Sequence, residues 1–154
     1  MQPMDVKIQS VIKMFHYPMW FIRLNKKISC PCVDHVTHQA KAGCSICLGT
    51  GYKIRLIRAM AARQTTESTG MRGPGIGYSE KNAADRFFTL DNLELKEGDI
   101  IVDNERVSVV QHYMPGRTDA SHPVYYRTVA TPMKTHLEMF KNAFKDLLRR
   151  KGYG

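Results

Sequence analysis

The 154-residue chain has no long apolar stretch. Its longest uninterrupted apolar runs, such as residues 19–22, are far shorter than the roughly 20 residues that cross a bilayer as a helix. The first ten residues also lack the charged head and the apolar stretch of about 7 to 15 residues that a signal peptide requires. We therefore expect a protein that is made in the cytoplasm and spans no membrane.

Acidic residues are few, with 14 Asp and Glu against 23 Lys and Arg, so the formal net charge is +9. Such an excess bears on association rather than on fold, and it indicates an acidic partner or surface. A hydrophobic content of 43% and a charged content of 24% are ordinary for a globular protein and exclude a wholly disordered chain. The length predicts a single domain over 1–154 with one modest core.

Recognisable catalytic motifs are also missing. The six histidines are scattered, and none lies in a nucleophile motif. The GPGIG string at 73–77 lacks the Gly-Lys-Ser/Thr of a phosphate-binding loop and does not match the dinucleotide fingerprint. Asp99 and Asp103 flank an expected strand on one face, but a pair at strand ends is usually solvated charge. The sequence therefore predicts that the protein is not an enzyme.

Short β-rich runs separated by turn signals fill much of the chain. They lie at 19–24, 52–60, 86–90, 98–103, 106–114 and 124–131. Their close spacing favours a mainly β (α+β) fold, a small antiparallel β-barrel or sandwich. Residues 64–84 are rich in Gly, Ser and Thr without apolar periodicity, which predicts a long flexible loop.

A helix is expected at each end of the chain. Residues 5–16 carry a loose apolar stripe that ends before Pro18. Residues 135–151 predict an amphipathic basic helix, with a capping box at Thr135 and Glu138 and an end at Gly152. Its apolar residues fall within an arc of about 100°. They are Leu137, Phe140, Phe144, Leu147 and Leu148, and the adjacent basic row is Lys141, Lys145 and Arg149.

Four cysteines, Cys30, Cys32, Cys44 and Cys47, form a C-x-C pair followed, after eleven residues, by a C-x-x-C pair. The cytosol keeps thiols reduced, so metal ligands are favoured over disulfides. Zinc takes four thiolates in a tetrahedron. Gly49 and Gly51 free the backbone to turn its amides toward the sulfurs. The pattern predicts a zinc knuckle over 30–51, inserted between two strands.

Other interpretations of this segment stay open. Asp34, His35 and His38 lie close enough in sequence to replace a cysteine ligand, and the cysteines could instead be a redox pair or simple thiols in a turn. A catalytic zinc keeps one position open and has a carboxylate base, whereas the carboxylate of this segment is only Asp34. A structural zinc is therefore expected. DnaJ-type chaperones share the C-x-x-C-x-G-x-G string, but the single repeat excludes their tandem domain.

The basic residues are candidates for contacts to nucleic-acid phosphates. The candidates are Arg55, Arg58, Arg63, Lys141, Lys145 and Arg149. The alternative is a solvated face that meets an acidic protein. Aromatic residues are absent from the basic stretches apart from Tyr52, which favours backbone attraction over base reading.

The order of these features carries a resemblance. An aromatic strand leads to C-x-C, C-x-x-C-L-G-T-G-Y returns as a strand, and a long loop precedes LKEGDIIVDNERVSVVQHY and VYYRTVA. Over residues 19–131 this resembles the neck proteins of tailed bacteriophages, the head-completion proteins of the adaptor, stopper or head-closure kind. The better-known stoppers lack the zinc knuckle.

The resemblance implies a small β-barrel whose copies form a homo-oligomeric ring on the portal axis. Its partners would be portal or adaptor protein, tail proteins and packaged DNA. Its location would be the virion, and the host cytoplasm before assembly. The expected function is a structural protein that connects head to tail and helps retain DNA. The alternatives are a zinc-dependent nucleic-acid-binding or regulatory protein and, in a third class, a zinc enzyme.

Overall fold

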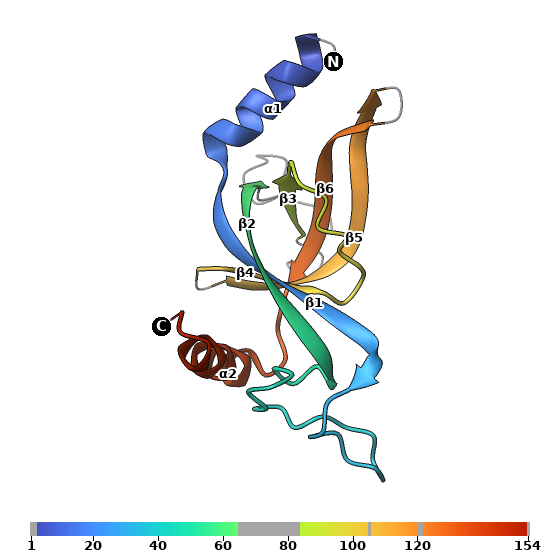
Figure 1. Ribbon diagram of the computed structural model, residues 1–154, viewed down its shortest axis with the longest axis vertical. Helices are drawn as coiled ribbons and strands as arrows, with labels where there is room; N and C mark the ends of the chain where they lie inside the picture. The colour runs from blue at the N-terminus through green and yellow to red at the C-terminus, as the bar shows by residue number, and fades with distance from the viewer. Residues whose placement is uncertain (1–2, 65–83, 105, 120–121, 154) are drawn as a thin grey trace, which may run out of the picture. The chain divides into compact units, whose positions relative to one another are not determined.

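The computed structural model describes residues 3–64, 84–104, 106–119 and 122–153. In chain order the elements are α1 (Pro3–Phe15), β1 (Tyr17–Ser29), β2 (Tyr52–Gln64), β3 (Asp85–Thr89), β4 (Ile100–Asp103), β5 (Arg106–Asp119), β6 (His122–Pro132) and α2 (Leu137–Arg150) (Figure 1). The strands form one antiparallel sheet that closes on itself in the order β1, β2, β3, β6, β5, β4. The expected mainly β class, with a helix at each end, is confirmed. The loop expected over 64–84 lies almost wholly outside the described residues.

The chain divides into two compact units. The sheet unit comprises residues 1–21 and 57–132, and the cysteine unit comprises residues 22–56 and 133–154. Because residues far apart in sequence share each unit, the division does not follow the chain order. The prediction of a knuckle insert at 30–51 falls within the cysteine unit, together with α2.

The core of the sheet unit is built from residues of its strands and of the segment between β3 and β4. Met19 and Phe21 of β1 are two residues apart, so both side chains point to the same side of the strand. The buried cluster consists of Met19, Phe21, Ala61, Phe87, Leu93, Leu95, Ile101, Val110 and Ala130. This period of two is expected of strands that bury one face.

The hairpin of β5 and β6 supports α1. Gly116 of β5 pairs with Tyr125 of β6, and a Cβ at position 116 would overlap the Tyr125 ring. That ring also meets Phe88 edge-on, with the centroids 5.8 Å apart. The amide of Gln9 in α1 donates to the Val124 carbonyl oxygen at 3.1 Å, which ties the helix to β6.

The C-terminal helix buries the face that the sequence predicted. Phe140, Ala143, Phe144 and Leu147 are buried, and the rings of Phe140 and Phe144 stack. Gly152, at φ +85°, ends the helix as predicted, and the amide of Tyr153 donates to the Leu148 carbonyl oxygen at 2.8 Å. Neither α1 nor α2 is long and apolar enough to cross a membrane.

The predicted start of α2 is wrong. His136, with φ 57°, is the N-cap, and it makes no side-chain capping hydrogen bond. The helix therefore begins at Leu137, two residues later than expected. Glu138 then occupies the second helical position, one residue short of the third position that a capping box requires.

Candidate metal centre

Two turns bring four cysteine sulfurs together. Cys30 and Cys32 follow β1, and Cys44 and Cys47 precede β2, as the segment between the two strands in Figure 1 shows. The four Sγ atoms lie within 4.8 Å of one another. Cys30 and Cys44 are 3.9 Å apart and Cys32 and Cys47 are 3.4 Å apart, sulfur to sulfur. A metal about 2.3 Å from each corner of a tetrahedron separates the sulfurs by about 3.8 Å, so the cluster is compatible with a metal ion.

The four cysteines are free thiols rather than disulfides. A disulfide brings its sulfurs to about 2.05 Å, far closer than either distance here. The four cysteines expected from the sequence to act together thus lie in one cluster, and they form no disulfide bond.

Glycines shape the turn that carries the second pair. Gly49 and Gly51 both have φ +83°, a conformation that L side chains rarely adopt. A Cβ at Gly49 would also lie 2.9 Å from the Ala42 carbonyl oxygen. The amide of Cys30 donates to the Gly51 carbonyl oxygen at 2.9 Å and joins the two ends of the segment. These glycines therefore allow both the tight turn and its closure.

Backbone amides point at the sulfurs, as expected. Burial raises the pKa of Cys47 to about 12, although the amides of Gly51 and Gly49 donate to its sulfur and oppose the rise. Burial also raises the pKa of Cys30. At Cys44 burial acts in the same direction, but the amides of Cys47 and Ile46 outweigh it and lower the pKa to about 7. The turn thus stabilises negative charge at Cys44, which a metal ligand requires.

The substitute ligands considered from the sequence lie outside the cluster. Asp34 accepts hydrogen bonds from the amides of Val36 at 2.7 Å and Thr37 at 3.3 Å, so its carboxylate closes a local turn. His35 and His38 are exposed. Within the described residues, the group that can hold a metal consists of the four cysteines.

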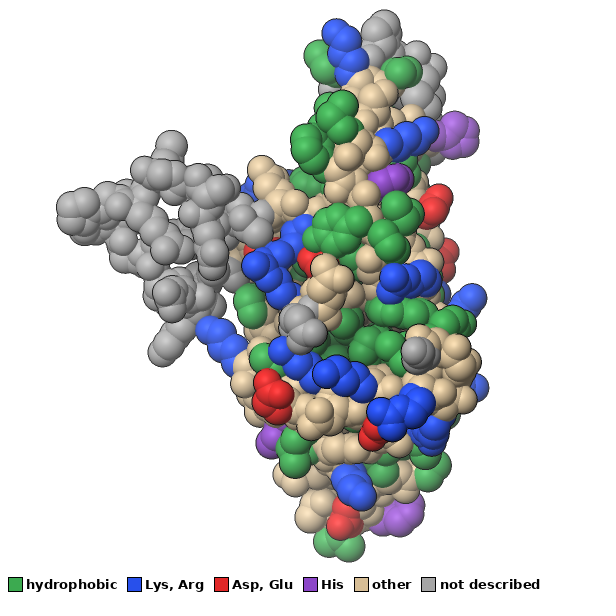
Figure 2. All heavy atoms as spheres, turned by 90° about the vertical axis from the view of Figure 1, so that its left-hand side faces the viewer, with side chains coloured by type: hydrophobic (Ala, Val, Ile, Leu, Met, Phe, Trp, Pro, Cys, Tyr) green, Lys and Arg blue, Asp and Glu red, His purple; other side chains and the backbone are tan. Residues whose placement is uncertain are grey.

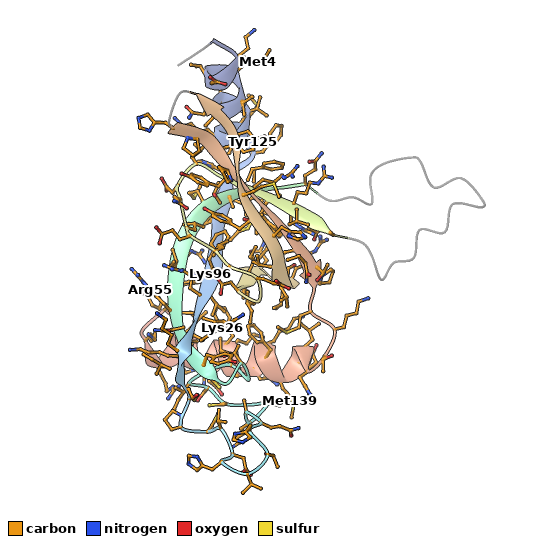
Figure 3. All side chains as sticks on the ribbon, turned by 90° about the vertical axis from the view of Figure 1, so that its right-hand side faces the viewer. Met4, Lys26, Arg55, Lys96, Tyr125 and Met139 are labelled. Atoms are coloured by element: carbon orange, nitrogen blue, oxygen red, sulfur yellow. The ribbon has the colours of Figure 1, made fainter. Side chains whose placement is uncertain are left out.

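The candidate phosphate contacts are dispersed. Arg55, Lys145 and Arg149 are exposed in the cysteine unit, where Lys141 is half-buried. Figure 3 labels Arg55 on β2 and Lys26 on β1, both at the surface of this unit.

The remaining two candidates lie in the sheet unit. The guanidinium of Arg58 lies over the Trp20 ring, 4.9 Å from its centroid. Arg63 is 13% exposed, 2.7 Å from Asp85 and 3.7 Å from Asp103. Carboxylates of its own unit therefore engage the Arg63 guanidinium.

The network around Arg63 was missed by sequence reasoning. The Tyr17 hydroxyl donates to Asp103 at 2.6 Å, so side chains of β1, β2, β3 and β4 meet through one set of polar contacts. Burial and the hydrogen bond to Asp103 raise the pKa of Tyr17 to about 12. No local sequence signal could have paired residues so far apart.

The two strand-end carboxylates are not solvated, which corrects the expectation for Asp99 and Asp103. Their exposed fractions are 3% and 4%. Asp99 accepts a hydrogen bond from the Lys96 amide at 2.8 Å and shapes the turn before β4. Asp103 accepts from Tyr17, so both carboxylates have structural partners.

The charge of the protein is divided unequally between its units. The cysteine unit has 12 Lys and Arg and three Asp and Glu, which gives 12 minus 3, or +9. The sheet unit has 11 of each sign and is neutral. The whole excess therefore belongs to the unit that carries the cysteines, although its residues come from two separate parts of the sequence.

The sheet unit offers an apolar surface instead. A groove of about 620 Å³ is lined by residues of α1, β2, β3 and β6, among them Met4 and Tyr125, which Figure 3 labels. Figure 2 shows hydrophobic side chains at the surface of α1. The exposed ones are Met4, Val6, Val11, Met14 and Phe15. A helix this apolar on its exposed side is typical of an interaction surface.

Comparison of the chain with protein-family models finds no match, and a search of curated proteins finds no significant match.

Proposed function

We propose that this chain is a non-catalytic structural protein of the neck of a tailed bacteriophage, where its copies assemble as a ring and its cysteine unit contacts packaged DNA. The resemblance over residues 19–131 motivates the proposal, and the closed antiparallel sheet with terminal helices agrees with the fold that it implies.

The unequal charge is the observation that carries the DNA contact. A unit of charge +9 attracts a polyanion, because each Lys or Arg near a phosphate displaces a condensed counterion. Repeating this unit around a ring multiplies the attraction. The neutral sheet unit remains available for contacts between proteins, with the exposed apolar residues of α1 as the proposed self-association surface.

The proposed metal is a structural zinc, held by Cys30, Cys32, Cys44 and Cys47. Four thiolates are a common ligand set of structural zinc, and they leave no coordination position for a reacting water. The ion would bind all four thiolates and so cross-link the turn that carries Cys30 and Cys32 to the turn that carries Cys44 and Cys47.

A zinc-dependent nucleic-acid-binding regulator is the second candidate, since the same charge distribution supports it. The two candidates differ in assembly. A neck protein forms rings, whereas a regulator binds DNA as a monomer or a small oligomer.

The deciding experiment is electron microscopy of the purified full chain, with and without a long DNA duplex. Rings of uniform diameter support the neck function. DNA binding by a monomeric protein at every concentration supports the regulator instead. The neighbouring genes provide a second test: portal and major capsid genes are expected next to this gene, and metabolic genes there would contradict the neck function.

A further inference from the structure

A recess of about 390 Å³ lies within the cysteine unit. Three segments form it: the turn between Cys44 and Cys47, the first part of β2, and the end of α2. Its lining combines four aliphatic and three cationic side chains. They are Ile46, Ile54, Leu56 and Leu147, and Lys53, Arg150 and Lys151.

The candidate metal centre and α2 both help to position the residues that line this recess. Ile46 is 55% exposed and lies between the two ligands Cys44 and Cys47. The Arg150 guanidinium donates to the neighbouring Ser45 carbonyl oxygen at 2.8 Å. Leu147, one turn before Arg150, is 6% exposed. Ile46 is thus exposed on a turn that two of the clustered cysteines flank and that a hydrogen bond joins to α2.

We propose that this recess binds an acidic peptide segment of a partner protein, one apolar side chain of which packs on Ile46, Ile54 and Leu56. Carboxylates on either side of that side chain would meet the cations at the rim. Charge complementarity supports this ligand class, because the unit carries +9. Burial of an apolar anchor among charge-assisted contacts is the usual composition of a protein-binding hot spot.

Nucleic acid fits the recess less well. Phosphates would meet the cations but would leave the aliphatic floor in water. Nucleic-acid bases usually bind proteins by stacking on aromatic rings, and none of the residues that line the recess is aromatic. The recess therefore adds a protein-binding function to the proposed DNA contact rather than repeating it.

Peptide binding should depend on the metal. Without an ion that joins Cys44 and Cys47 to the first pair, the turn that carries Ile46 loses its constraint. Coupling between two sites is reciprocal, so the peptide should also tighten metal binding by the factor by which the metal tightens peptide binding.

The test uses the zinc-loaded full chain and a fluorescein-labelled peptide with a Leu-Phe pair flanked on both sides by Asp and Glu. We expect saturable binding by fluorescence anisotropy, weakened about tenfold or more by Ile46→Ser, which removes the apolar wall without adding charge. Lys53→Gln should weaken it as well. The matched controls, Val36→Ser and Lys41→Gln, change exposed residues of the same segment outside the recess and should leave binding unchanged.

Each variant is also assayed for zinc content and for binding to a short DNA duplex. Retained zinc in Ile46→Ser ensures that a lost peptide contact is not a lost metal site. Equal peptide binding by Ile46→Ser and the parent overturns the proposal, and so does an absence of peptide binding by the parent. The proposal is also overturned if Ile46→Ser weakens binding to the DNA duplex but not to the peptide. Failure of the duplex to bind the parent contradicts the proposed DNA contact alone and leaves the peptide result to stand.

Discussion

The Arg150 guanidinium, at the end of α2, donates a 2.8 Å hydrogen bond to the carbonyl oxygen of Ser45, which lies between Cys44 and Cys47. A residue of the basic helix and a residue of the cysteine turn, 105 positions apart in sequence, are thereby joined. The contact links the candidate metal centre to the basic helix, so removal of a metal bound there should alter the surface around the helix end as well as the cysteine turn.

The first prediction concerns the metal. The full chain purified under reducing conditions should contain one zinc ion, and Cys44→Ser with Cys47→Ser should contain none. Hydrogen exchange should accelerate over residues 30–51 in that variant and stay slow in the core strands of the sheet unit, whose buried cluster is separate from the cysteine cluster. Ser45→Ala, a change in the same turn, should retain the ion. Elemental analysis that finds zinc in the double variant would contradict the proposed ligand set.

Acid should release the metal, because protons and metal compete for the thiolates. In the metal-free protein the pKa of Cys47 is raised to about 12 and that of Cys30 is raised as well, so both bind protons above pH 7. The logarithm of the metal affinity should then rise by at least two for each pH unit just above pH 7. Cys44, with a pKa of about 7, should steepen the dependence below pH 7. Competition with a chelator of known affinity measures the slope, and an affinity independent of pH would contradict this account.

The sequence was sufficient to predict features that depend on neighbours along the chain. The cysteine spacing and the two glycines predicted the turn, the period of apolar residues predicted α2, and the β-rich runs between turn signals predicted the strands. The burial of Arg63 could not be predicted in this way, since Asp85 and Asp103 reach it only through strand pairing. The concentration of charge was equally hidden, because the cysteine unit is assembled from two segments that residues 57–132 of the sheet unit separate in the sequence.

Local rules also failed where tertiary structure competes with them. Thr135 matched the composition of a capping box, yet the chain enters α2 through a left-handed His136. Asp99 and Asp103 resembled solvated strand ends, but both are buried, and each accepts a hydrogen bond, from the Lys96 amide and from the Tyr17 hydroxyl respectively. The glycines at 49 and 51 were interpreted correctly because the conformational requirement acts at the glycine itself.

Alkaline pH should destabilise the sheet unit through Tyr17. Its pKa is about 12 in the folded protein and near 10.0 when unperturbed, so the unfolded chain loses the phenolic proton first. The contribution of Tyr17 to the free energy of unfolding is complete below about pH 10, falls as the pH rises, and is lost above about pH 12. In denaturant titrations, the free energy of unfolding of Tyr17→Phe should fall less with rising pH than that of the parent. Tyr153→Phe, a change at a 63% exposed residue, should behave as the parent does.

The apolar surface of α1 should mediate self-association. Val11 and Phe15 are 53% and 64% exposed, so Val11→Ser with Phe15→Ser should leave the stability of the monomer within about 0.5 kcal/mol. Burying each side chain against a neighbouring copy contributes about 1.5 to 3 kcal/mol, so association should weaken by more than about tenfold. Sedimentation velocity over a range of concentrations measures the effect. Val36→Ser is the control at an exposed residue of the other unit, and equal association by the double variant would exclude α1 from the interface.

The last prediction tests the electrostatic contact with DNA. Replacing Lys141, Lys145 and Arg149 by Gln should leave folding intact, because the buried face of α2 consists of other residues. Each lost phosphate contact reduces the slope of log affinity against log salt by about 0.9, so the triple variant should lower the slope by up to about 3. The matched control is Lys7→Gln, Lys13→Gln and Lys96→Gln, which removes the same charge from the sheet unit. Anisotropy of a labelled duplex across a range of salt concentrations separates the two variants. An equal decrease of the slope in the α2 variant and the control variant would show that DNA binding depends only on net charge. An unchanged slope in the α2 variant would show that Lys141, Lys145 and Arg149 form a solvated surface that does not contact DNA.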